Sequence, residues 1–574
     1  MLKSIYFYDK ILQNIIQVGV YMSFIKAVIA LFLSILSAFN IFRGPVEVPQ
    51  QPSRENFTYL EYPEEAIINP SDIGLTTSQF TGRANDDGDE LYVNAQGYQD
   101  INGIIESPYF SVIVEHKIIP VYATTVFVGN TQKGALHSFC EIYVDTSKPI
   151  NLDFQLNTHG FVMKSVQVFP SSLNFKPLYN NTVLNNEITQ LGTYTFVFND
   201  NDQEHGFTLF VRELVDEDKE IEEYKKQGYN VVPVEKGFHS SDAFFDFYGW
   251  SNTVFYLKRG SYLLAKHTID IASDNDNHNN DSKKESDLMN AGHLPMGLTR
   301  CPYLNLTCCS NVKIVGSGVV DLSHLDRAER RGIVIAYASN IEISGVKFIN
   351  SPEWTFITYD SENITIKDVD IFGYRQNSDA FAICNTRNAT IENSFCRSGD
   401  DLFDVKTAGG RPEAISQNIT FSNCTAWNGK ARCFGICGEV NMDIKDVTFK
   451  DSCVVFHDAV WNANRIPAIA IVVEQAGGSI SNVTFENIEI NHAYSRAIGC
   501  LIYDESNTIE NFNISGVKYK NIRYNSAKPN KIASNNKANY IQTEFENVYA
   551  NGYKITQVDS GNFEYDQYAT ITIK

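Results

Sequence analysis

A short motif recurs through the second half of the chain: an asparagine followed by apolar, polar and apolar residues in turn. Its copies begin at Asn311, Asn340, Asn363, Asn388, Asn418, Asn441, Asn482 and, less clearly, Asn513. The first five intervals are 29, 23, 25, 30 and 23 residues. A repeat of roughly this length without helical periodicity predicts a solenoid of stacked parallel strands.

Each repeat also contains two further short apolar runs, such as Val369-Asp-Ile-Phe and Phe381-Ala-Ile-Cys, so each coil is expected to hold three strands. A leucine-rich repeat is the competing architecture. It is disfavoured because the leucine signature is absent and because Ile, Val, Phe and Thr dominate the runs. Asparagine before a strand suits a turn that needs a positive φ. The predicted fold is therefore an all-β parallel β-helix.

The preceding region has a different pattern. Between residues 61 and 215, apolar and polar residues alternate in runs such as Val121-Tyr-Ala-Thr-Thr-Val-Phe-Val, separated by Gly, Asn and Asp. This spacing predicts a β-sandwich. The charged, helix-compatible stretch from Val215 to Gly228 indicates a connector over 216–235. The β-helix domain is then expected to cover 236–574, with a polar loop inserted at 273–285.

The first 45 residues resemble a targeting segment. From Met22, a lysine precedes an apolar run that ends near Ser37 and Ala38, as in a signal peptide. Met22 is therefore a possible initiator, and an uncleaved membrane anchor is the alternative. A Pro- and Gln-containing linker is expected over 46–60. Ten Asn-x-Ser/Thr sequons fit a secreted glycoprotein, although asparagines that only form turns would give the same pattern; they lie at Asn56, Asn180, Asn280, Asn305, Asn363, Asn388, Asn418, Asn423, Asn482 and Asn513.

Composition narrows the choice of partners. The net charge of −21 disfavours binding to nucleic acid or to anionic lipid. The 11 cysteines show no spacing typical of zinc, so we expect no metal and no cofactor. In a secreted chain some cysteines are expected in disulfides, with at least one free because the number is odd; a buried thiol is the alternative for Cys384, Cys396 and Cys424. We expect a monomer with a polysaccharide substrate.

Three aspartates stand before two of the apolar runs. Asn377-Ser378-Asp379 precedes one run, and Gly399-Asp400-Asp401 precedes the next, 21 to 22 residues later. Aligning the runs places Asp379 beside Asp401, about 4.8 Å away in a stacked coil. Three carboxylates at this spacing cannot all ionise easily, so at least one pKa should rise. The arrangement predicts a general acid beside water-activating carboxylates, as in inverting glycoside hydrolysis, where acid and base lie about 6.5–9.5 Å apart.

Neighbouring residues are candidates for contacting the substrate. Alternation along the run after Asp401 places Leu402, Asp404 and Lys406 on one face, with Phe403 and Val405 facing the core. Lys406 then faces the groove. The full set of predicted substrate-binding residues is Trp354, Tyr374, Arg375, Asp404, Lys406 and Arg432.

The motif series resembles that of the family 28 polygalacturonases. Their pattern is Asn-Thr-Asp, then Gly-Asp-Asp-Cys and, in many members, a lysine five residues after the second aspartate of that group. The resemblance covers roughly residues 235–525 and extends to the clan that includes the family 49 dextranases. It implies a right-handed parallel β-helix. It also implies that Asp400 is the general acid and that Asp379 and Asp401 hold the attacking water.

Two family features are missing. The Gly-His-Gly expected near 432–438 lacks its histidine, and the Arg-x-Lys clamp for a galacturonate carboxylate has no match near 468–474. Arg375, Lys406, Arg432 and Arg465 remain candidates for binding a uronate. A sandwich before the β-helix resembles the dextranases, which makes an α-glucan the alternative substrate.

Two further functions stay open. One is a non-catalytic β-helix that binds glycans, although such a module has no need of three close acids. The other is a polysaccharide lyase, in which Asp404 and Glu439 would join a Ca²⁺ cluster.

Overall fold

The computed structural model describes residues 56–69, 82–84, 91–92, 101–129, 133–200, 202–241, 245–266, 303–325, 331–375, 377–408, 414–459, 465–504 and 508–574. The predicted signal peptide or anchor, most of the linker and the polar insertion lie outside these residues. Within them, no helix is long and apolar enough to cross a membrane.

The N-terminal part is a β-sandwich of two sheets, antiparallel except where β14 runs parallel to β8. The larger sheet contains β1 (Phe57–Tyr59), β2 (Gly82–Ala84), β3 (Leu91–Tyr92), β4 (Ile105–Glu106), β7 (Tyr122–Val128), β8 (Lys133–Val144), β10 (Val166–Phe169), β13 (Gly192–Phe198) and β14 (Asp202–Glu213). The smaller sheet contains β5 (Phe110–Val114), β6 (Lys117–Ile119), β9 (Leu152–Thr158), β11 (Leu178–Tyr179) and β12 (Val183–Ile188). Two short 3-10 helices, η1 (Glu64–Ala66) and η2 (Ser171–Leu173), complete it.

The sandwich begins earlier than the sequence predicted. Strand β1 lies inside the predicted linker, where it pairs antiparallel with β8 over Phe57–Tyr59. The Phe57 side chain is buried in the sandwich core together with Phe110, Phe154 and Phe196. Because alternating Phe57-Thr-Tyr can fill a free edge of the sheet, the polar residues before it do not prevent order here.

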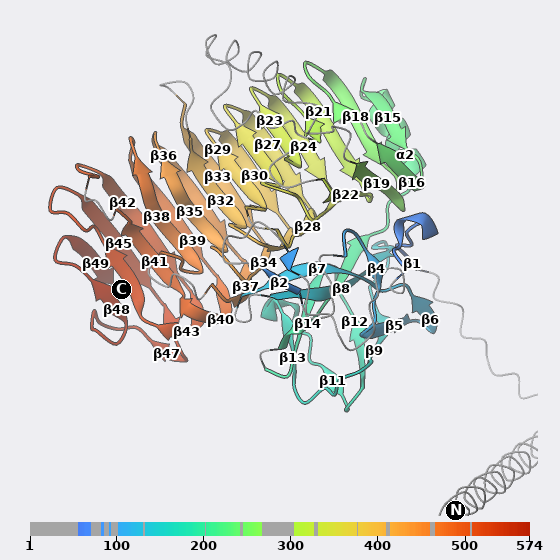
Figure 1. Ribbon diagram of the computed structural model, residues 1–574, viewed down its shortest axis with the longest axis horizontal. Coiled ribbons are helices and arrows are strands. Elements are labelled where there is room, and N and C mark those ends of the chain that lie inside the picture. The colour runs from blue at the N-terminus through green and yellow to red at the C-terminus, as the bar shows by residue number, and fades with distance from the viewer. Residues whose placement is uncertain are drawn as a thin grey trace, which may run out of the picture. The chain divides into compact units, whose positions relative to one another are not determined.

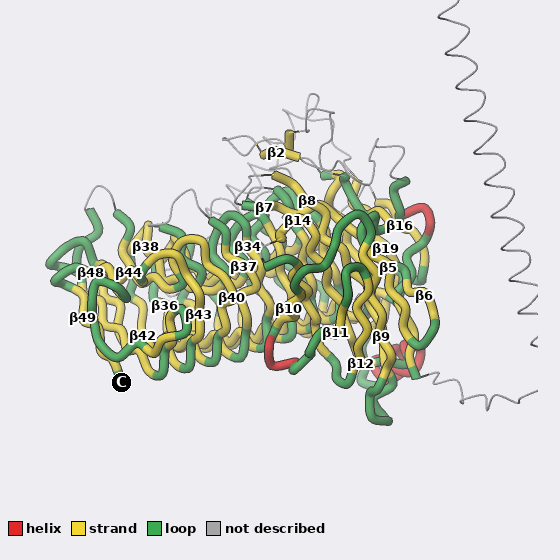
Figure 2. The backbone as a smooth tube through the Cα atoms, turned by 90° about the horizontal axis from the view of Figure 1, so that it is seen from below, coloured by secondary structure: helices red, strands yellow, loops and turns green. Residues whose placement is uncertain are grey.

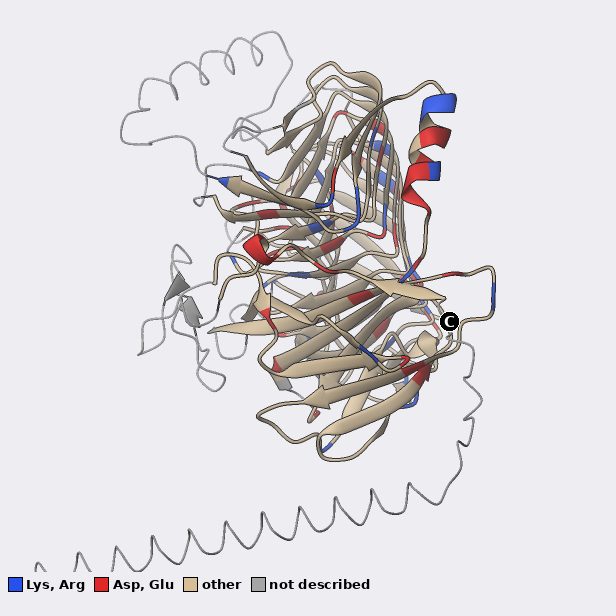
Figure 3. Ribbon diagram, turned by 90° about the vertical axis from the view of Figure 1, so that its right-hand side faces the viewer, with Lys and Arg blue, Asp and Glu red and all other residues tan. Residues whose placement is uncertain are grey.

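The connector forms helix α2 (Glu217–Lys226). Asp216 caps it by accepting a hydrogen bond from the Lys219 backbone, acidic side chains fill the first turn, and Lys225 and Lys226 lie in the last turn. This order of charges complements the helix dipole and is visible as red followed by blue in Figure 3. The β-helix starts four residues after α2, at Asn230, which is inside the predicted connector.

The remaining strands wind into a β-helix with three parallel sheets, whose coils follow one another from green to red in Figure 1 and dominate the yellow trace of Figure 2. Sheet 1 contains β15 (Asn230–Val234), β18 (Ser251–Leu257), β21 (Ser310–Gly316), β24 (Ser339–Ser344), β27 (Glu362–Lys367), β30 (Arg387–Glu392), β33 (Ser416–Ser422), β36 (Ile444–Lys450), β39 (Ile480–Glu486), β42 (Asn513–Lys520), β45 (Tyr540–Glu546) and β49 (Ala569–Ile573).

Sheet 2 contains β16 (Gly237–Ser241), β19 (Ser261–Lys266), β22 (Val319–His324), β25 (Lys347–Ile349), β28 (Asp370–Phe372), β31 (Phe395–Ser398), β34 (Thr425–Asn428), β37 (Cys453–His457), β40 (Glu489–Arg496), β43 (Arg523–Lys528), β46 (Tyr549–Ala550) and the antiparallel β47 (Tyr553–Lys554). Sheet 3 contains β17 (Phe245–Asp246), β20 (Leu304–Asn305), β23 (Ile333–Ala336), β26 (Phe356–Tyr359), β29 (Phe381–Cys384), β32 (Phe403–Thr407), β35 (Phe434–Val440), β38 (Ile469–Ala476), β41 (Ile498–Ile502), β44 (Asn530–Ala533) and β48 (Phe563–Tyr565). The predicted parallel β-helix is confirmed.

The repeated asparagine has the predicted structural role. Asn340, Asn363, Asn388 and Asn418 all have φ between 55° and 59°. Their amides form a ladder in which each side chain donates to the one in the preceding coil, at 2.8–3.1 Å. The ladder links successive turns of the solenoid through side-chain amides along its exposed edge.

Two of the predicted repeats are misplaced. The register pairs β33 with β36 so that Asp446, not Asn441, takes the ladder position, with φ 57° and a 2.7 Å hydrogen bond from Asn482. In the coil that follows Asn482, the position belongs to Gly516, with φ 65°, rather than to Asn513. The turn requires a positive φ, and aspartate and glycine meet that requirement without an asparagine motif.

Some sequons are structural elements of these ladders. The side chains of Asn363, Asn388, Asn418, Asn423 and Asn482 each donate to a neighbour in the preceding coil. The nitrogen that a glycan would modify is already engaged in a ladder hydrogen bond in each of these residues. These sequons therefore fit the turn-forming explanation.

The core of the β-helix runs along its axis. Inward side chains stack in rows, for example Phe356, Phe381, Phe403 and Phe434, whose neighbouring ring centroids lie 4.9–5.5 Å apart. The ten cysteines among the described residues are all free thiols, and nine are buried. The expected disulfides are therefore not formed by these ten, because most of them fill core positions as small apolar side chains.

The sandwich packs against the outer face of sheet 2. Phe139 and Phe210 of the sandwich contact a cluster that includes Phe372 and Phe395 of the β-helix. Lys347, which is 2% exposed, forms ion pairs with Glu141 of the sandwich and with Asp370 at 2.7 Å. The interface is thus as buried as a core and places the sandwich beside the turns that lead from sheet 2 to sheet 3.

Candidate active site

The three predicted acids lie in two consecutive turns between sheet 2 and sheet 3. Asp379 precedes β29, and Asp400 and Asp401 connect β31 to β32. Strands β29 and β32 pair in parallel with Phe381 opposite Phe403, and the Ala380 amide donates to the Asp401 carbonyl at 2.9 Å. Asp379 and Asp401 are therefore in equivalent positions, one coil apart, as the sequence alignment predicted.

The acids are brought close together. One oxygen from each of Asp379, Asp400 and Asp401 lies within 4.8 Å of the others. Asp379 and Asp401 are each 3% exposed, whereas Asp400 is partly exposed. The group is a buried pair of carboxyls with a third that reaches solvent.

Lys406 lies in the centre of the acids. Its Nζ is 2.8 Å from Asp404, 3.5 Å from Glu439, 3.7 Å from Asp401 and 3.8 Å from Asp379. It also donates to the Cys437 carbonyl at 3.1 Å. A buried ammonium with four carboxylates around it compensates charges that would otherwise be too costly to bury.

A second set of ion pairs extends from Asp401. The Arg432 backbone and its Nη1 donate to the two oxygens of Asp401, at 2.9 and 3.0 Å. Arg432 Nη2 contacts Glu474 at 2.7 Å, and Arg465 also binds Glu474, through Nε at 2.7 Å and through Nη2. Acids and bases therefore alternate along the chain of contacts Asp401, Arg432, Glu474 and Arg465.

The acids have different proton affinities. Burial and then Asp401 raise the pKa of Asp400 to about 6, and burial and then Asp400 raise the pKa of Asp379 well above its usual range. Burial alone would also raise the pKa of Asp401, but Arg432 and Lys406 outweigh it and lower that pKa. Asp401 is the member that stays ionised, and Asp379 and Asp400 are the members that retain protons.

Trp354 joins this group from the neighbouring coil. It occupies the position before β26 that Asp379 occupies before β29, as the pairing of Phe356 with Phe381 shows. The Lys406 ammonium lies 5.2 Å from its ring centroid. An aromatic ring next to the acids is suited to packing against the apolar face of a sugar.

Three other predicted substrate contacts have structural roles in the described residues. Tyr374 is 2% exposed and packs against the sandwich residue Phe127, with ring centroids 6.1 Å apart. Arg375 donates through both Nη atoms to the Leu325 and Ser323 carbonyls. Asp404 is 1% exposed and holds Lys406. Their burial or existing bonds give these three residues structural roles, and direct contact with a substrate stays a prediction for them.

The alternation predicted around Lys406 is correct except at its first residue. Phe403 and Val405 face the core, and Asp404 and Lys406 face away from it. Leu402 also belongs to the core cluster. It precedes β32, where the turn has not yet adopted the alternating geometry of a strand.

Sequence reasoning missed several neighbours of the acids. Asn428 donates to the Asp400 and Arg432 carbonyls, at 2.8 and 2.9 Å, and so braces the turn from inside. His457 is fully buried, and burial lowers its pKa to about 3, so its ring is neutral. In the sequence, Glu474 ends an apolar stretch that lacks the Arg-x-Lys clamp, and nothing in that stretch marks it as a neighbour of the acids. The residue lies 73 positions after Asp401, and only the stacking of coils brings it near.

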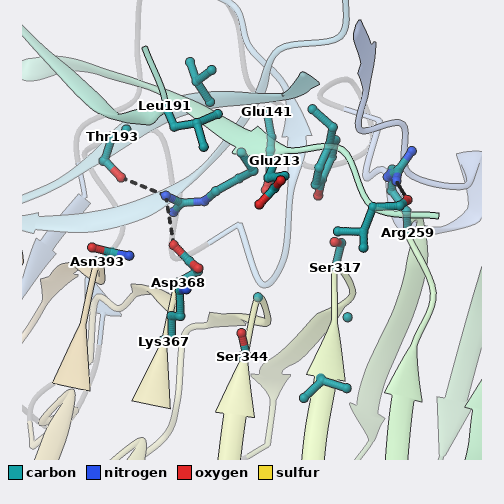
Figure 4. A pocket seen from close by; sticks show the side chains of 18 of the residues that line it. Glu141, Leu191, Thr193, Glu213, Arg259, Ser317, Ser344, Lys367, Asp368 and Asn393 are labelled. Atoms are coloured by element: carbon teal, nitrogen blue, oxygen red, sulfur yellow. Dashed lines mark hydrogen bonds and ion pairs between the residues drawn. The ribbon is translucent and has the colours of Figure 1, made fainter. Parts of the chain in front are cut away.

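The cavity drawn in Figure 4 is separate from the group of acids. Its volume is about 350 Å³, and it lies between the sandwich, α2 and the turns of the β-helix, lined by residues such as Glu213, Arg259, Ser317 and Asp368. None of the predicted site residues lines it. The ion pair between Arg212 of the sandwich and Asp368 of the β-helix, at 3.7 Å, joins two walls of this cavity. The cavity therefore belongs to the packing interface between the sandwich and the β-helix.

The sandwich touches the turn next to the acids. Gly129, which follows β7, lies so close to Gly429 that a Cβ on Gly129 would be 1.8 Å from the Gly429 carbonyl oxygen. Gly429 follows Asn428, the side chain that holds the Asp400 carbonyl. The Lys430 ammonium lies 5.4 Å from the ring centroid of Phe127 in the same sandwich strand.

Replacing Gly129 with alanine is therefore expected to disturb both stability and turnover. The added methyl group must displace backbone, which costs about 1–3 kcal/mol in a well-packed region. The shift passes through Gly429 and Asn428 to Asp400, so kcat should fall several-fold along with the melting temperature. Thermal unfolding and steady-state kinetics on the same preparation measure both. A variant with wild-type Tm and kcat would show that the sandwich does not brace this turn.

Comparison with known proteins agrees with the motif series. Residues 319–565 match the family model described as glycosyl hydrolases family 28. This match confirms the family 28 resemblance. The matched region contains all three acids and begins at the first residue of β22, so the sandwich lies outside it.

Individual relatives are distant. Endopolygalacturonase I of Aspergillus aculeatus is 30% identical over 159 residues, which cover 26% of this chain and 38% of that protein. A hyperthermoactive exopolygalacturonase from Thermotoga maritima has a TM-score of 0.41 at 17% identity, covering 62% of this chain and 87% of that one. The catalytic domain of a GH87 α-1,3-glucanase, solved with nigerose, has a TM-score of 0.37 at 11% identity and covers 90% of this chain and 98% of that one. The chain spans less than half the length of the curated relatives it matches.

Proposed function

We propose that this protein hydrolyses O-glycosidic bonds in a polysaccharide, with a pectin-type galacturonan as the first candidate substrate. The observation that carries the proposal is the acid triad on two neighbouring coils, in which one carboxyl has a raised pKa and another a lowered pKa. Two carboxyls with pKa values driven apart by their surroundings are what acid and base catalysis on one bond requires. The family 28 match supports the same reaction.

Each acid has a role that its surroundings favour. Asp400 is partly exposed and retains a proton near pH 6, so it is the group that protonates the leaving oxygen. Asp401 stays ionised beside Arg432 and Lys406, so it takes the proton from water. Asp379 favours its neutral form and positions the water through its remaining acceptor oxygens. This refines the resemblance-based roles, in which Asp379 and Asp401 were equivalent.

The spacing of the acids bears on stereochemistry. The nearest oxygens lie within 4.8 Å, closer than the carboxyl separation of about 6.5–9.5 Å in inverting enzymes and nearer to the about 5–5.5 Å of retaining ones. We propose inversion because Asp379 and Asp401 lie in equivalent positions of two neighbouring coils, where they can hold a water between them, whereas Asp400 is the partly exposed acid. Proton NMR of the first products reports their anomeric configuration. Products with the configuration of the substrate would instead assign one of these aspartates as a nucleophile.

A calcium-dependent lyase is disfavoured by the position of Lys406. Asp404 and Glu439, the candidate ligands, both contact its ammonium, at 2.8 and 3.5 Å. The positive charge of the side chain occupies the place that a cation between these carboxylates would take. The Lys406 ammonium therefore already compensates the negative charge of the two carboxylates that would bind Ca²⁺.

Product analysis tests the proposal. The purified protein is incubated with polygalacturonate, rhamnogalacturonan, dextran and pullulan, and new reducing ends are measured together with the absorbance of unsaturated products. Hydrolysis releases reducing ends without that absorbance. Absorbance that chelation abolishes would favour the lyase, and cleavage of dextran or pullulan alone would favour the α-glucan alternative. No cleavage of any polymer would favour a glycan-binding role.

We expect activity to fall as the pH rises through about 6. Asp400 must be protonated to donate, and its pKa is raised to about 6. Because raised pKa values of Asp400 and Asp404, about 6 and about 7, mean tighter proton binding in the folded state, stability should also decline from about pH 4 to pH 7. Profiles of kcat/KM and of Tm against pH measure the two effects. Activity that increases steadily to pH 8 would contradict the acid role.

A further inference from the structure

The chain of ion pairs that leads away from the acids ends at accessible side chains. Glu474 has 19% and Arg465 has 34% of its side chain exposed, whereas Arg432, which links Glu474 to Asp401, has only 9% exposed. Glu474 is ionised because Arg465 and Arg432 outweigh the effect of burial and lower its pKa. The Glu474 carboxylate is therefore accessible next to the three acids, and the guanidinium groups beside it are already paired with it.

Four cations near the acids each have a carboxylate partner within 4.0 Å in the described structure. Arg331 pairs with Glu353, Lys406 with four acids, and Arg432 and Arg465 share Glu474. The described cluster holds four cations and seven carboxyl groups, namely Glu353, Asp379, Asp400, Asp401, Asp404, Glu439 and Glu474. Even with two acids protonated, its charge is not positive.

A sugar carboxylate would gain little in this environment. To bind Arg432 or Arg465 it would have to compete with Glu474, which already uses both oxygens. It would also approach Asp401, the acid that stays ionised, in a buried region where repulsion between like charges is weakly screened. Sugar hydroxyls, in contrast, can donate to the Glu474 carboxylate and accept from the Arg465 guanidinium without adding charge.

We propose that the sugar residue bound against Glu474 and Arg465 is uncharged, and that Glu474 is the specificity-determining residue that excludes a free uronate there. This inference rests on the proposed hydrolase function and narrows its substrate. A neutral hexose, a deoxyhexose or an esterified uronate has the required chemistry. Unsubstituted polygalacturonate has the same ring but carries the excluded charge.

One pair of substrates isolates the charge. Homogalacturonan with a high degree of methyl esterification and its de-esterified form share backbone and linkage and differ in carboxylate charge. We expect the wild-type protein to cleave the esterified polymer with a kcat/KM at least tenfold higher. Dextran and an alternating rhamnose–galacturonate polymer, assayed in parallel, identify whether the neutral residue is a hexose or a deoxyhexose. Faster cleavage of the free polygalacturonate would overturn the proposal.

Glu474→Gln tests the residue itself. The change removes the carboxylate and leaves Arg432 and Arg465 to attract an anion, so the ratio of kcat/KM for esterified over free polymer should drop at least fivefold. The gain on free polymer should weaken as salt is added. Glu342→Gln is the matched control, because it removes the acid of the Lys313 ion pair on sheet 1 and should leave the ratio unchanged. An unchanged ratio in Glu474→Gln, with Tm near wild type, contradicts the proposal.

Binding separates this inference from the proposed function. If the wild-type protein cleaves none of the polymers, the hydrolase proposal fails. Calorimetric titration of the Asp400→Asn protein with methyl-esterified and free trigalacturonide, and with a neutral maltotriose or isomaltotriose, then still reports the preference. Tighter binding of an uncharged ligand than of the free trigalacturonide supports the neutral site. Tighter binding of the free acid rejects it.

Discussion

Replacing Asp400 with asparagine is expected to lower kcat by about 10³-fold, with little change in KM. Positioned general acids contribute about 10²–10⁴-fold to rate, and no other partly exposed carboxyl in the triad can take over proton donation. Asparagine keeps the shape of the side chain, and the backbone of Asp400 would still accept from Asn428. Initial rates of reducing-end release over a range of substrate concentrations separate the two parameters.

A matched control for this variant is Asp446→Asn. Asp446 occupies a position of the asparagine ladder in sheet 1, where other coils carry asparagine, so the change should be tolerated with full activity. The remaining activity of Asp400→Asn should no longer decline above pH 6, because deprotonation of Asp400, whose pKa is raised to about 6, causes that decline in the wild-type protein. An Asp400→Asn protein that cleaves as fast as wild type would assign the acid role to Asp379.

Replacing Lys406 with methionine is expected to destabilise the protein by about 3–5 kcal/mol at pH 8. Removing one partner of a buried ion pair leaves its counter-charges uncompensated, and Lys406 has four carboxylates within 4.0 Å. Activity should be lost as well, because Lys406 keeps the pKa of Asp401 low. Urea unfolding measures the stability directly.

The pH dependence of the stability of Lys406→Met shows whether lost charge compensation or lost packing causes the destabilisation. Without Lys406 the carboxyls can escape repulsion only by binding protons, so the destabilisation should be smaller at pH 5 than at pH 8. Lys313→Met provides the comparison, since Lys313 forms a more exposed ion pair with Glu342 and should cost about 1 kcal/mol or less at either pH. Equal losses at both pH values for Lys406→Met would point to packing rather than charge.

The sandwich packs directly against the strands and turns that hold the acids, which a separate binding module would not require. Its strand β7 packs beside β28 and β31, the strands that precede the two acid turns, and Gly129 abuts Gly429. Tyr374, which the sequence assigned to the substrate, is part of this contact. The sandwich therefore shapes the turns that hold the acids from behind.

The sequence by itself determined the coil and the meeting of the acids. The asparagine turns, with their positive φ, and the alternating apolar runs favour a solenoid of stacked parallel strands, and the 22-residue offset then places Asp379 over Asp401. Both conclusions follow from local periodicity. Where a turn accepted a different residue, as at Asp446 and Gly516, the motif failed although the geometry was kept.

The tertiary structure alone decided what surrounds the acids. The number of residues between coils varies, so nothing in the local pattern shows that Glu474 reaches Arg432 or that Arg375 is committed to the carbonyls of an earlier coil. Nor does it show that a sandwich loop would rest on Gly429. Such contacts join segments far apart along the chain, and they set the charge balance that gives each acid its proton affinity and the neighbouring subsite its preference.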